Sequence, residues 1–292
     1  MGTNLTSQSQ LRALDWIANQ DNRYLLPTND DNNAVELLQR FLVVDFYFST
    51  SLDHPWTDCN PIDDDNKTNN DNISNVTSTG HRSNSLCYYE ANYAYTYLGG
   101  SQAITYTFLP NQYEIVTAVR WLSTEYHECQ WAGLFCNDQR QVQALHLERM
   151  NLTGTLPEHL HLLNGLTTLS LKENSLRGTL PVSLSKLTTL SALDLGTNQF
   201  TGTVPSNWWH PRQRQESHSS NSNSKSSADG NSNNSNTTTW MLRHMSLQSN
   251  QLSKWRIPTD IGMTSLKYLY LMDAGLTGSI PTQISRMTEL SK

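Results

Sequence analysis

The stretch of sequence that decides the fold is LTTLSLKENSLRGTLPVSLSKLTT, at residues 166–189 of this 292-residue chain. Residues 190–209, LSALDLGTNQFTGTVPSNWW, align with it residue for residue at a step of 24. One step back lies VQALHLERMNLTGTLPEHLHLLNG, at 142–165, and the register returns in two later units that begin at Leu242 and Leu266. The chain ends as a sixth unit begins. Five aligned units at one spacing indicate a repeat architecture.

Each residue class in the unit has a physical task. The LxxLxL segment alternates like a short strand, which sends its leucines inward and leaves the residues between them on a concave sheet. Asn174, Asn198 and Asn250 follow that strand, where an inward amide can satisfy backbone groups at the turn. Met150 and Ala274 stand at this position in the first and last units. One unit cannot bury its apolar face, so we expect stability to come from stacking.

Gly-Thr-Leu-Pro runs follow the strand segments and mark the return path on the convex side. In the fourth unit Lys254 stands where the other units have Gly, and one extra residue precedes Ile257-Pro258. We therefore predict an irregular convex turn there. In the third unit, Trp208 occupies an apolar consensus position and is expected in the core, whereas the neighbouring Trp209 is expected at the surface.

The pattern LxxLxLxxNxLxGxIPxxLxxL resembles the plant-type extracellular leucine-rich repeat (LRR). Upstream, CQWAGLFC at 129–136 resembles the amino-terminal LRR cap, C-x-W-x-G-V-x-C, and Trp121-Leu122 fits the same cap. The resemblance implies an α/β fold, a solenoid of plant-type 24-residue repeats whose open apolar end is covered by the cap and Trp131. It also implies a Cys129–Cys136 disulfide, which leaves Cys59 and Cys87 to form a second one. None of the four cysteines lies in CxxC spacing, so a zinc site is not favoured.

The chain before the cap predicts a helical lead-in. QLRALDWIANQ at 10–20 and AVELLQRFLVVDFYFST at 34–50 carry apolar residues at helical intervals. Residues 46–48 could instead belong to a strand. With His54-Pro55-Trp56, this region resembles the lead-in of microalgal LRR proteins of receptor-like type, which often carry a transmembrane segment upstream.

These features divide the chain into a lead-in at 1–58, an insertion at 59–120, the cap at 121–141 and five LRR units at 142–292. The insertion holds a polar low-complexity loop at 60–85 and a Tyr-rich segment at 86–119, which is a hairpin candidate. A second polar segment, at about 211–239, interrupts the third repeat. Both polar segments hold too few apolar residues to offset the entropy of ordering, so we predict disordered loops.

The features that bear on compartment disagree. Seven Asn-X-Ser/Thr acceptors are candidates for N-glycosylation, which favours the secretory pathway: Asn4, Asn66, Asn72, Asn75, Asn151, Asn233 and Asn236. The amino terminus has neither the basic nor the apolar region of a signal peptide, and no stretch of about 18 apolar residues could span a bilayer. We expect a cell-surface or extracellular protein. We also expect this sequence to be a fragment of it, with a membrane anchor outside the fragment. Met1-Gly2 with Thr6 fits a loose myristoylation pattern, which would suit an intracellular protein.

Several function classes are disfavoured. The net charge is −6, which removes the basic footprint of a nucleic-acid binder. No nucleophile, zinc-protease, phosphate-loop or kinase motif occurs, so we expect no catalytic residue, metal or cofactor. His127, Glu128 and Cys129 adjoin, and His159 and His161 flank Leu160, but neither set has metal-ligand spacing, so these histidines are expected at the surface.

A repeat sheet suits recognition, because it presents columns of residues at fixed spacing to an extended partner. Exposed aromatic residues in the last unit add to this expectation, since such residues are enriched at binding hot spots. The candidate ligand-binding residues of the concave face are His146, Glu148, Arg149, Ser170, Lys172, Asp194, Ser246, Gln248, Tyr268, Tyr270 and Met272. The alternative is that these are solvated strand residues and that the ligand surface lies on repeats outside this chain.

The sequence therefore predicts a noncatalytic LRR domain that recognises a protein, peptide or glycan, as the ectodomain of a receptor-like signalling protein. One alternative is a secreted or wall-associated adhesion or inhibitor protein. Another is an intracellular LRR scaffold, which would require reduced cysteines.

Overall fold

The computed structural model describes residues 7–23, 31–56, 59, 86–91, 93–97, 104–108, 114–209 and 242–291. The two low-complexity segments that the sequence predicts as disordered lie outside this part of the chain. So do six glycosylation candidates: Asn4, Asn66, Asn72, Asn75, Asn233 and Asn236.

Two helices form the lead-in, as the apolar spacing predicts. Helix α1 spans Gln8–Asn19 and starts with a capping box, in which Gln10 N donates to Ser7 Oγ over 3.2 Å. Helix α2 spans Asp31–Thr50. Residues 46–48 belong to this helix, so the strand alternative is wrong. Among the described residues, no helix is both long enough and apolar enough to cross a membrane.

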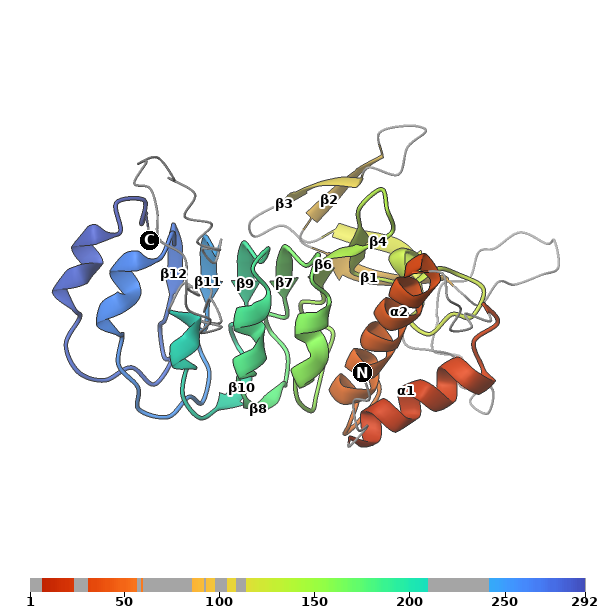
Figure 1. The fold of residues 1–292 in the computed structure, drawn as a ribbon, viewed down its shortest axis with the longest axis horizontal. Helices are drawn as coiled ribbons and strands as arrows, with labels where there is room; N and C mark the ends of the chain where they lie inside the picture. The colour runs from red at the N-terminus through yellow and green to blue at the C-terminus, as the bar shows by residue number, and fades with distance from the viewer. Residues whose placement is uncertain are drawn as a thin grey trace, which may run out of the picture.

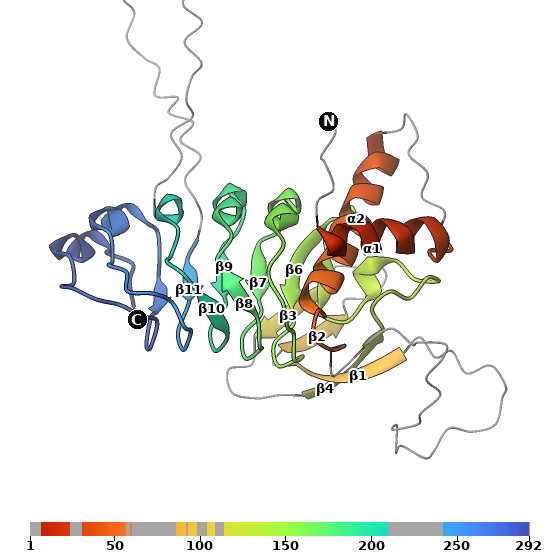
Figure 2. The same cartoon turned by 90° about the horizontal axis from the view of Figure 1, so that it is seen from below.

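The Tyr-rich segment forms two antiparallel strand pairs. Strand β1 (Leu86–Ala91) pairs with β4 (Glu114–Val119), and β2 (Tyr93–Tyr97) pairs with β3 (Ile104–Phe108). Figure 2 shows these strands near the first repeat, on the opposite side from α1 and α2. Since β4 leads directly into the cap, the segment is anchored at the start of the repeats.

The main sheet has six strands, in the order β12-β11-β9-β7-β6-β5 (Figure 1). Strand β5 (Leu134–Cys136) runs antiparallel to β6 (Val142–His146), and all later pairs are parallel. The parallel strands after β6 are β7 (Thr168–Ser170), β9 (Ala192–Asp194), β11 (His244–Ser246) and β12 (Tyr268–Tyr270). Leu145 pairs with Leu169, and Leu169 pairs with Leu193, so equivalent residues of successive units lie side by side in the sheet.

The convex side carries short 3₁₀ turns, which Figure 1 shows in a row across the sheet. Each follows a Pro that stands at its N-cap. The turns are η2 (Glu158–Leu162), η3 (Val182–Lys186), η4 (Ser206–Trp208), η5 (Thr259–Met263) and η6 (Thr282–Arg286). Two short parallel strands, β8 (Arg177–Thr179) and β10 (Gln199–Thr201), pair between the second and third units.

The fourth unit departs from this pattern where Lys254 replaces Gly. There Trp255 forms an isolated bridge with Leu276, and its ring stacks on Trp209 at a centroid distance of 5.9 Å. Trp209 is only 2% exposed, so the expectation of a surface position is wrong. The additional ring of the fourth unit covers it. Trp208 is buried, as its consensus position predicts.

Asn174, Asn198 and Asn250, which we call the asparagine ladder, link neighbouring units. The Asn198 amide donates to the carbonyl oxygens of Leu171 and Leu195 over 2.9 and 3.2 Å, and its oxygen accepts from Leu176 N over 3.0 Å. Asn174 and Asn250 form the corresponding bonds in their own units. The turns of these three units thus satisfy their buried backbone groups, as the sequence predicts.

The cap closes the amino-terminal end of the stack. Both predicted disulfides are confirmed, Cys129–Cys136 within the cap and Cys59–Cys87 at the insertion. Trp131 is buried, and it contacts Trp121 and Trp16 at centroid distances of 5.5 and 6.1 Å. One continuous apolar core therefore runs from the lead-in through the cap into the repeats.

Buried polar groups also join α2 to the cap. Gln39 donates to the carboxylate of Glu128 and to Arg140 O, both over 2.9 Å, and its oxygen accepts from Val142 N over 2.7 Å. His127 lies between Glu36 and Glu128, at 3.3 and 3.5 Å, and burial lowers its pKa. The expectation that His127 lies at the surface is wrong, because α2 covers it together with Glu128.

Candidate ligand-binding surface

The concave face of the main sheet is the candidate ligand-binding surface. Each parallel strand places its central residue in the core and its two flanking residues on the other side. Residues at equivalent positions of successive units therefore form columns across the sheet. The predicted site residues fall into these columns, but their exposure differs from one strand to the next.

In the first unit, two predicted site residues are buried. His146 is 4% exposed and Glu148 is 7% exposed, and the two side chains lie 3.4 Å apart between Nδ1 and Oε1. The ring of Phe135 on the cap strand meets the His146 ring edge-on at 5.3 Å. The expectation that these two residues face solvent is wrong, because the cap strand extends the sheet past β6.

Two predicted serines are buried as well. Ser170 and Ser246 lie in the column between bulkier neighbours, and Ser246 is 2% exposed. Strands of a sheet lie about 4.8 Å apart, so a short side chain is covered by the longer ones beside it. Ser246 therefore contributes a hydrogen-bonding group to the floor of the surface and does not present an exposed side chain.

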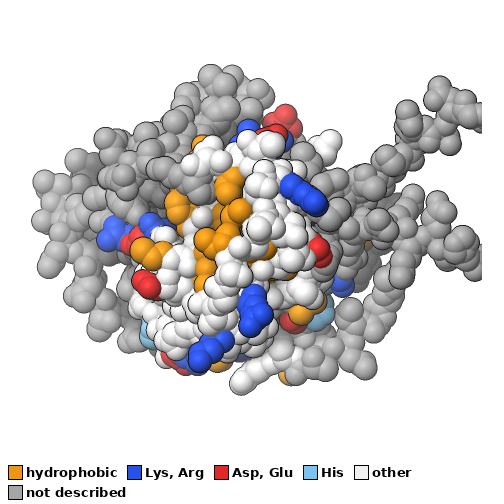
Figure 3. Space-filling model, turned by 90° about the vertical axis from the view of Figure 1, so that its left-hand side faces the viewer, with side chains coloured by type: hydrophobic (Ala, Val, Ile, Leu, Met, Phe, Trp, Pro, Cys, Tyr) orange, Lys and Arg blue, Asp and Glu red, His pale blue; other side chains and the backbone are white. Residues whose placement is uncertain are grey.

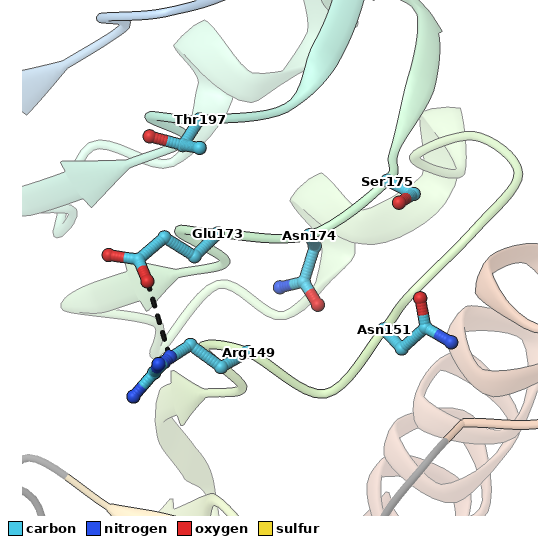
Figure 4. A pocket seen from close by; sticks show the side chains of 6 residues that line it. All are labelled: Arg149, Asn151, Glu173, Asn174, Ser175 and Thr197. Carbon is cyan, nitrogen blue, oxygen red and sulfur yellow. Dashed lines mark ion pairs between the residues drawn. The ribbon is translucent and has the colours of Figure 1, made fainter.

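At the edge of the surface, the first two units share a set of paired charges. Arg149 Nε lies 3.2 Å from Glu173 Oε2, and Lys172 Nζ lies 2.8 Å from Glu173 Oε1. Arg149 and Glu173 also line an open pocket of about 470 Å³, together with Asn151, Asn174, Ser175 and Thr197. Figure 4 shows Arg149 and Glu173 pointing toward one another across one side of it.

The residues at the turn before each ladder position have positive φ angles. The five are Arg149 (59°), Glu173 (57°), Thr197 (55°), Ser249 (52°) and Asp273 (51°). This left-handed conformation is uncommon for residues other than glycine, although Asn and Asp adopt it more readily than the rest. In the first four units, the next unit accepts a hydrogen bond from the backbone N–H of this residue, for example Gln248 O from Thr197 N over 2.8 Å.

The centre of the surface is formed by Asp194 on β9 and the residues around it. Gly196 N donates to Asp194 Oδ1 over 2.9 Å, and Ser246 on β11 also hydrogen-bonds to this carboxylate. Burial raises the pKa of Asp194, although these hydrogen bonds and the charges of His244 and Lys172 act to lower it. The carboxylate is thus held in a fixed position by neutral donors.

His244 belongs to this centre, and the sequence analysis missed it. Its ring lies 5.5 Å from the Tyr270 ring and 6.0 Å from the Tyr268 ring. Burial lowers the pKa of His244, while Asp194 acts to raise it. Its position two residues before Ser246 in a strand of period two would have placed it on the same face.

The surface ends in an apolar region at the β12 edge. Figure 3 shows hydrophobic side chains grouped at this end of the molecule. Met272 is 66% exposed, and Tyr268, Leu276 and Ile280 are also exposed there. Gln248, on the neighbouring unit, is half-buried beside Gly196. The structure therefore brings Asp194, Gln248, Tyr268, Tyr270 and Met272 to one half of the concave side.

Asn151 is the glycosylation candidate that the structure describes. It is partly exposed at the rim of the open pocket, while Thr153 of the same acceptor motif is buried against the end of α2. Thr153 N donates to Thr50 O over 2.8 Å. Among the described residues, no group of three His, Cys, Asp or Glu side chains could hold a metal ion.

Comparison with known proteins supports the resemblance seen in the sequence. The family described as Leucine Rich Repeat matches residues 165–187. The leucine-rich repeat receptor-like serine/threonine-protein kinase RGI4 of Arabidopsis thaliana is 40% identical over 52 residues, which are 18% of this chain and 5% of that protein. The matched segment therefore spans a small part of that relative. Residues 165–187 therefore match a leucine-rich repeat, and the chain is similar to plant LRR receptor-like proteins.

Solved LRR ectodomains of Arabidopsis thaliana are also similar. The BIR3–SERK2 complex gives 25% identity and a TM-score of 0.40, and covers 56% of this chain and 74% of that one. The SOBIR1 receptor kinase ectodomain gives 24% and 0.41, covering 56% and 78%. The GASSHO1/SCHENGEN3 ectodomain, solved with CASPARIAN STRIP INTEGRITY FACTOR 2, gives 27% and 0.42, covering 57% and 17%.

Proposed function

We propose that this chain is a noncatalytic recognition domain, the ligand-binding part of a receptor-like cell-surface protein built on a solenoid of 24-residue repeats. The observation that carries the proposal is the polar and aromatic half of the concave face, where Asp194, His244, Tyr268 and Tyr270 gather from three strands. Aromatic side chains with fixed polar groups are typical of binding hot spots.

A protein or peptide ligand suits this surface, because parallel strands offer a row of contacts to an extended chain. The relative RGI4 is named as a receptor-like kinase, and the GASSHO1/SCHENGEN3 ectodomain was solved with a bound factor. Both names support a recognition role for the repeats. The two disulfides support a place outside the cell, where such bonds persist.

Panning a random dodecapeptide library on the oxidised chain tests this function. A Tyr268→Ala/Tyr270→Ala variant should lose the selected binders, because it removes the tyrosine rings of β12 from the concave side. Val182→Ala is the matched control, since Val182 is exposed on the convex turn η3. Binders that survive the concave change, or that depend on Val182, would overturn the proposal.

The alternatives separate by chemistry that does not depend on the ligand. An intracellular scaffold would have reduced cysteines and no glycan at Asn151, which mass spectrometry of the protein from its own cells would show. A secreted adhesion or inhibitor protein would share the disulfides. It would bind a wall polysaccharide or wall-degrading enzyme in the same surface assay, and peptides would not compete.

A further inference from the structure

The Asp194 carboxylate at the centre of the concave face has hydrogen-bond partners but no close counter-ion among the described residues. Its bonds come from neutral donors, Gly196 N at 2.9 Å and the Ser246 hydroxyl. A carboxylate offers about four acceptor sites, so two such bonds leave it able to accept more. A charge that is largely buried is retained at a cost unless a partner compensates it.

The nearest cation on the sheet is already paired. Lys172 lies on the neighbouring unit, and its ammonium is 2.8 Å from the Glu173 carboxylate. The imidazole of His244 faces Asp194 from β11, and burial lowers its pKa, which disfavours its charged form. A guest that brings a positive charge to Asp194 would offset the cost of burying this carboxylate, so the centre of this half of the surface favours a cation.

The aromatic rings on β12, one strand beyond the Ser246 neighbour of Asp194, favour a particular kind of cation. Tyr268 and Tyr270 stand on β12 with the His244 ring 6.0 and 5.5 Å from them. Aromatic faces attract cations, and the planar guanidinium both stacks on rings and forms paired hydrogen bonds to carboxylates. A carboxylate at the floor and rings at the side match those two properties of an arginine side chain.

Because Gly196 has no side chain, it leaves the space beside the Asp194 carboxylate open to a ligand. Gly196 occupies the column in which other units carry Glu148, Lys172, Gln248 and Met272. A Cβ atom added there would lie 3.1 Å from Asp194 Oδ1, 2.8 Å from Ser246 Oγ and 3.0 Å from Gln248 Cγ. The third unit therefore presents backbone beside Asp194, where its neighbours present long side chains.

We propose that the site formed by Asp194, His244, Tyr268 and Tyr270 binds an arginine side chain of a peptide that lies along the concave face. The assignment rests on the proposed recognition function and adds the chemical class of the ligand. The negative charge of the chain, −6, would also speed the approach of a basic peptide.

The probe is Nα-acetyl-arginine amide, followed by NMR of the side-chain signals of His244, Tyr268 and Tyr270. Nα-acetyl-citrulline amide is its matched neutral analogue, because it keeps the shape and removes the charge. Saturable shifts with the arginine probe, and binding weaker by at least about tenfold with citrulline, are expected for a charge-assisted contact. Equal binding of the two probes would overturn the assignment.

Two variants locate the contact. Asp194→Asn should weaken arginine binding to the level of the citrulline probe, while Asp138→Asn, an exposed carboxylate of the cap, should leave it unchanged. If both variants weaken binding equally, the overall negative charge of the chain attracts the probe, and the assignment to Asp194 fails. The citrulline comparison uses the unaltered chain, so it decides the matter even if Asp194→Asn does not fold.

Acidification provides a third readout. His244 and Ser246 of β11 and Lys172 of the second unit act on Asp194, while Tyr268 and Tyr270 lie one strand further away, on β12. Protonation of Asp194, whose pKa is raised, removes the attraction, and protonation of His244 adds repulsion, so binding should fall as the pH is lowered. Binding that strengthens on acidification contradicts the assignment.

The outcomes also separate this assignment from the broader function. Peptides selected on the concave face that lack arginine would leave the recognition function standing and overturn the arginine site. Arginine binding at Asp194 without any peptide that binds the concave face would leave the arginine site standing and overturn the recognition function.

Discussion

The guanidinium of Arg40 donates to the carboxylate of Glu128 over 2.9 Å between Nη1 and Oε2, with both side chains fully buried. Asp21 accepts two further bonds from the same guanidinium, at 2.5 and 2.8 Å. The rings of Trp16 and Trp131 lie 5.3 and 5.0 Å from the Arg40 charge. One cation of α2 thus holds the lead-in and the cap together.

Removing one member of this cluster should destabilise the chain strongly. Glu128→Ala leaves the buried Arg40 charge short of a partner, so we expect the free energy of unfolding to fall by about 3–5 kcal/mol. Glu289→Ala breaks the exposed pairs with Arg243 and Lys267 and should cost below about 1 kcal/mol. Denaturant titration measures both variants. Similar losses would mean that the buried cluster contributes nothing special.

Asp45 predicts a pH dependence of stability. Its side chain is buried in α2 with Oδ1 unpaired, and burial raises its pKa, although Ser9, Ser49 and His159 act to lower it. A carboxyl whose pKa is higher in the folded state stabilises the fold below the unfolded pKa and loses that contribution as the pH rises through the folded value.

Asp45→Asn should therefore gain in stability relative to the original chain as the pH rises. Denaturant titrations of the two proteins between pH 4 and pH 8 check the difference at each pH. The difference removes the contribution of every other titrating group that the two chains share. A difference that grows as the pH falls would contradict the assignment.

The asparagine ladder predicts a cost for Asn198→Ala. The substitution leaves the carbonyls of Leu171 and Leu195 and the N–H of Leu176 without their partner in a buried turn. We expect a loss of about 2–4 kcal/mol, since each unsatisfied buried group costs roughly 1–3 kcal/mol. Asn164→Ala, at an exposed position, is the control. Thermal unfolding should separate the two variants clearly.

Thr197 predicts a gain in stability. Its φ of 55° is unfavourable for a β-branched residue, and Asn adopts this region more readily. Thr197→Asn should raise the free energy of unfolding by about 0.5–1 kcal/mol. Thr288→Asn, at an exposed residue outside the positive-φ set, should give no gain. Destabilisation by Thr197→Asn would show that the threonine side chain makes a contact that outweighs the strain.

The sequence predicted what depends on local pattern. The repeat step placed Leu145, Leu169 and Leu193 in one register, and the turn asparagines fell where the ladder requires them. The cap motif fixed the cysteine pairing. These features follow from periodicity and short motifs, which a single sequence displays directly.

Contacts between segments that are distant in the sequence could not be predicted from the repeat pattern. Arg40 and Glu128 are far apart in sequence, and no sequence motif predicts that they form an ion pair. The burial of His146 depends on Phe135 of the cap strand, and that of Trp209 on Trp255 of the following unit. His244 shares its column with Ala192 and Thr168, so no repeated polar pattern in the sequence distinguishes that position.

The Cys59–Cys87 bond has a covalent consequence for handling the protein. A protease that cuts any peptide bond between these two cysteines yields two polypeptides that stay attached through sulfur. The nicked molecule would migrate as a single band without a reducing agent and as two bands with one. Purity judged on a non-reducing gel would therefore hide such cleavage, and a reducing gel or an intact mass measurement would reveal it.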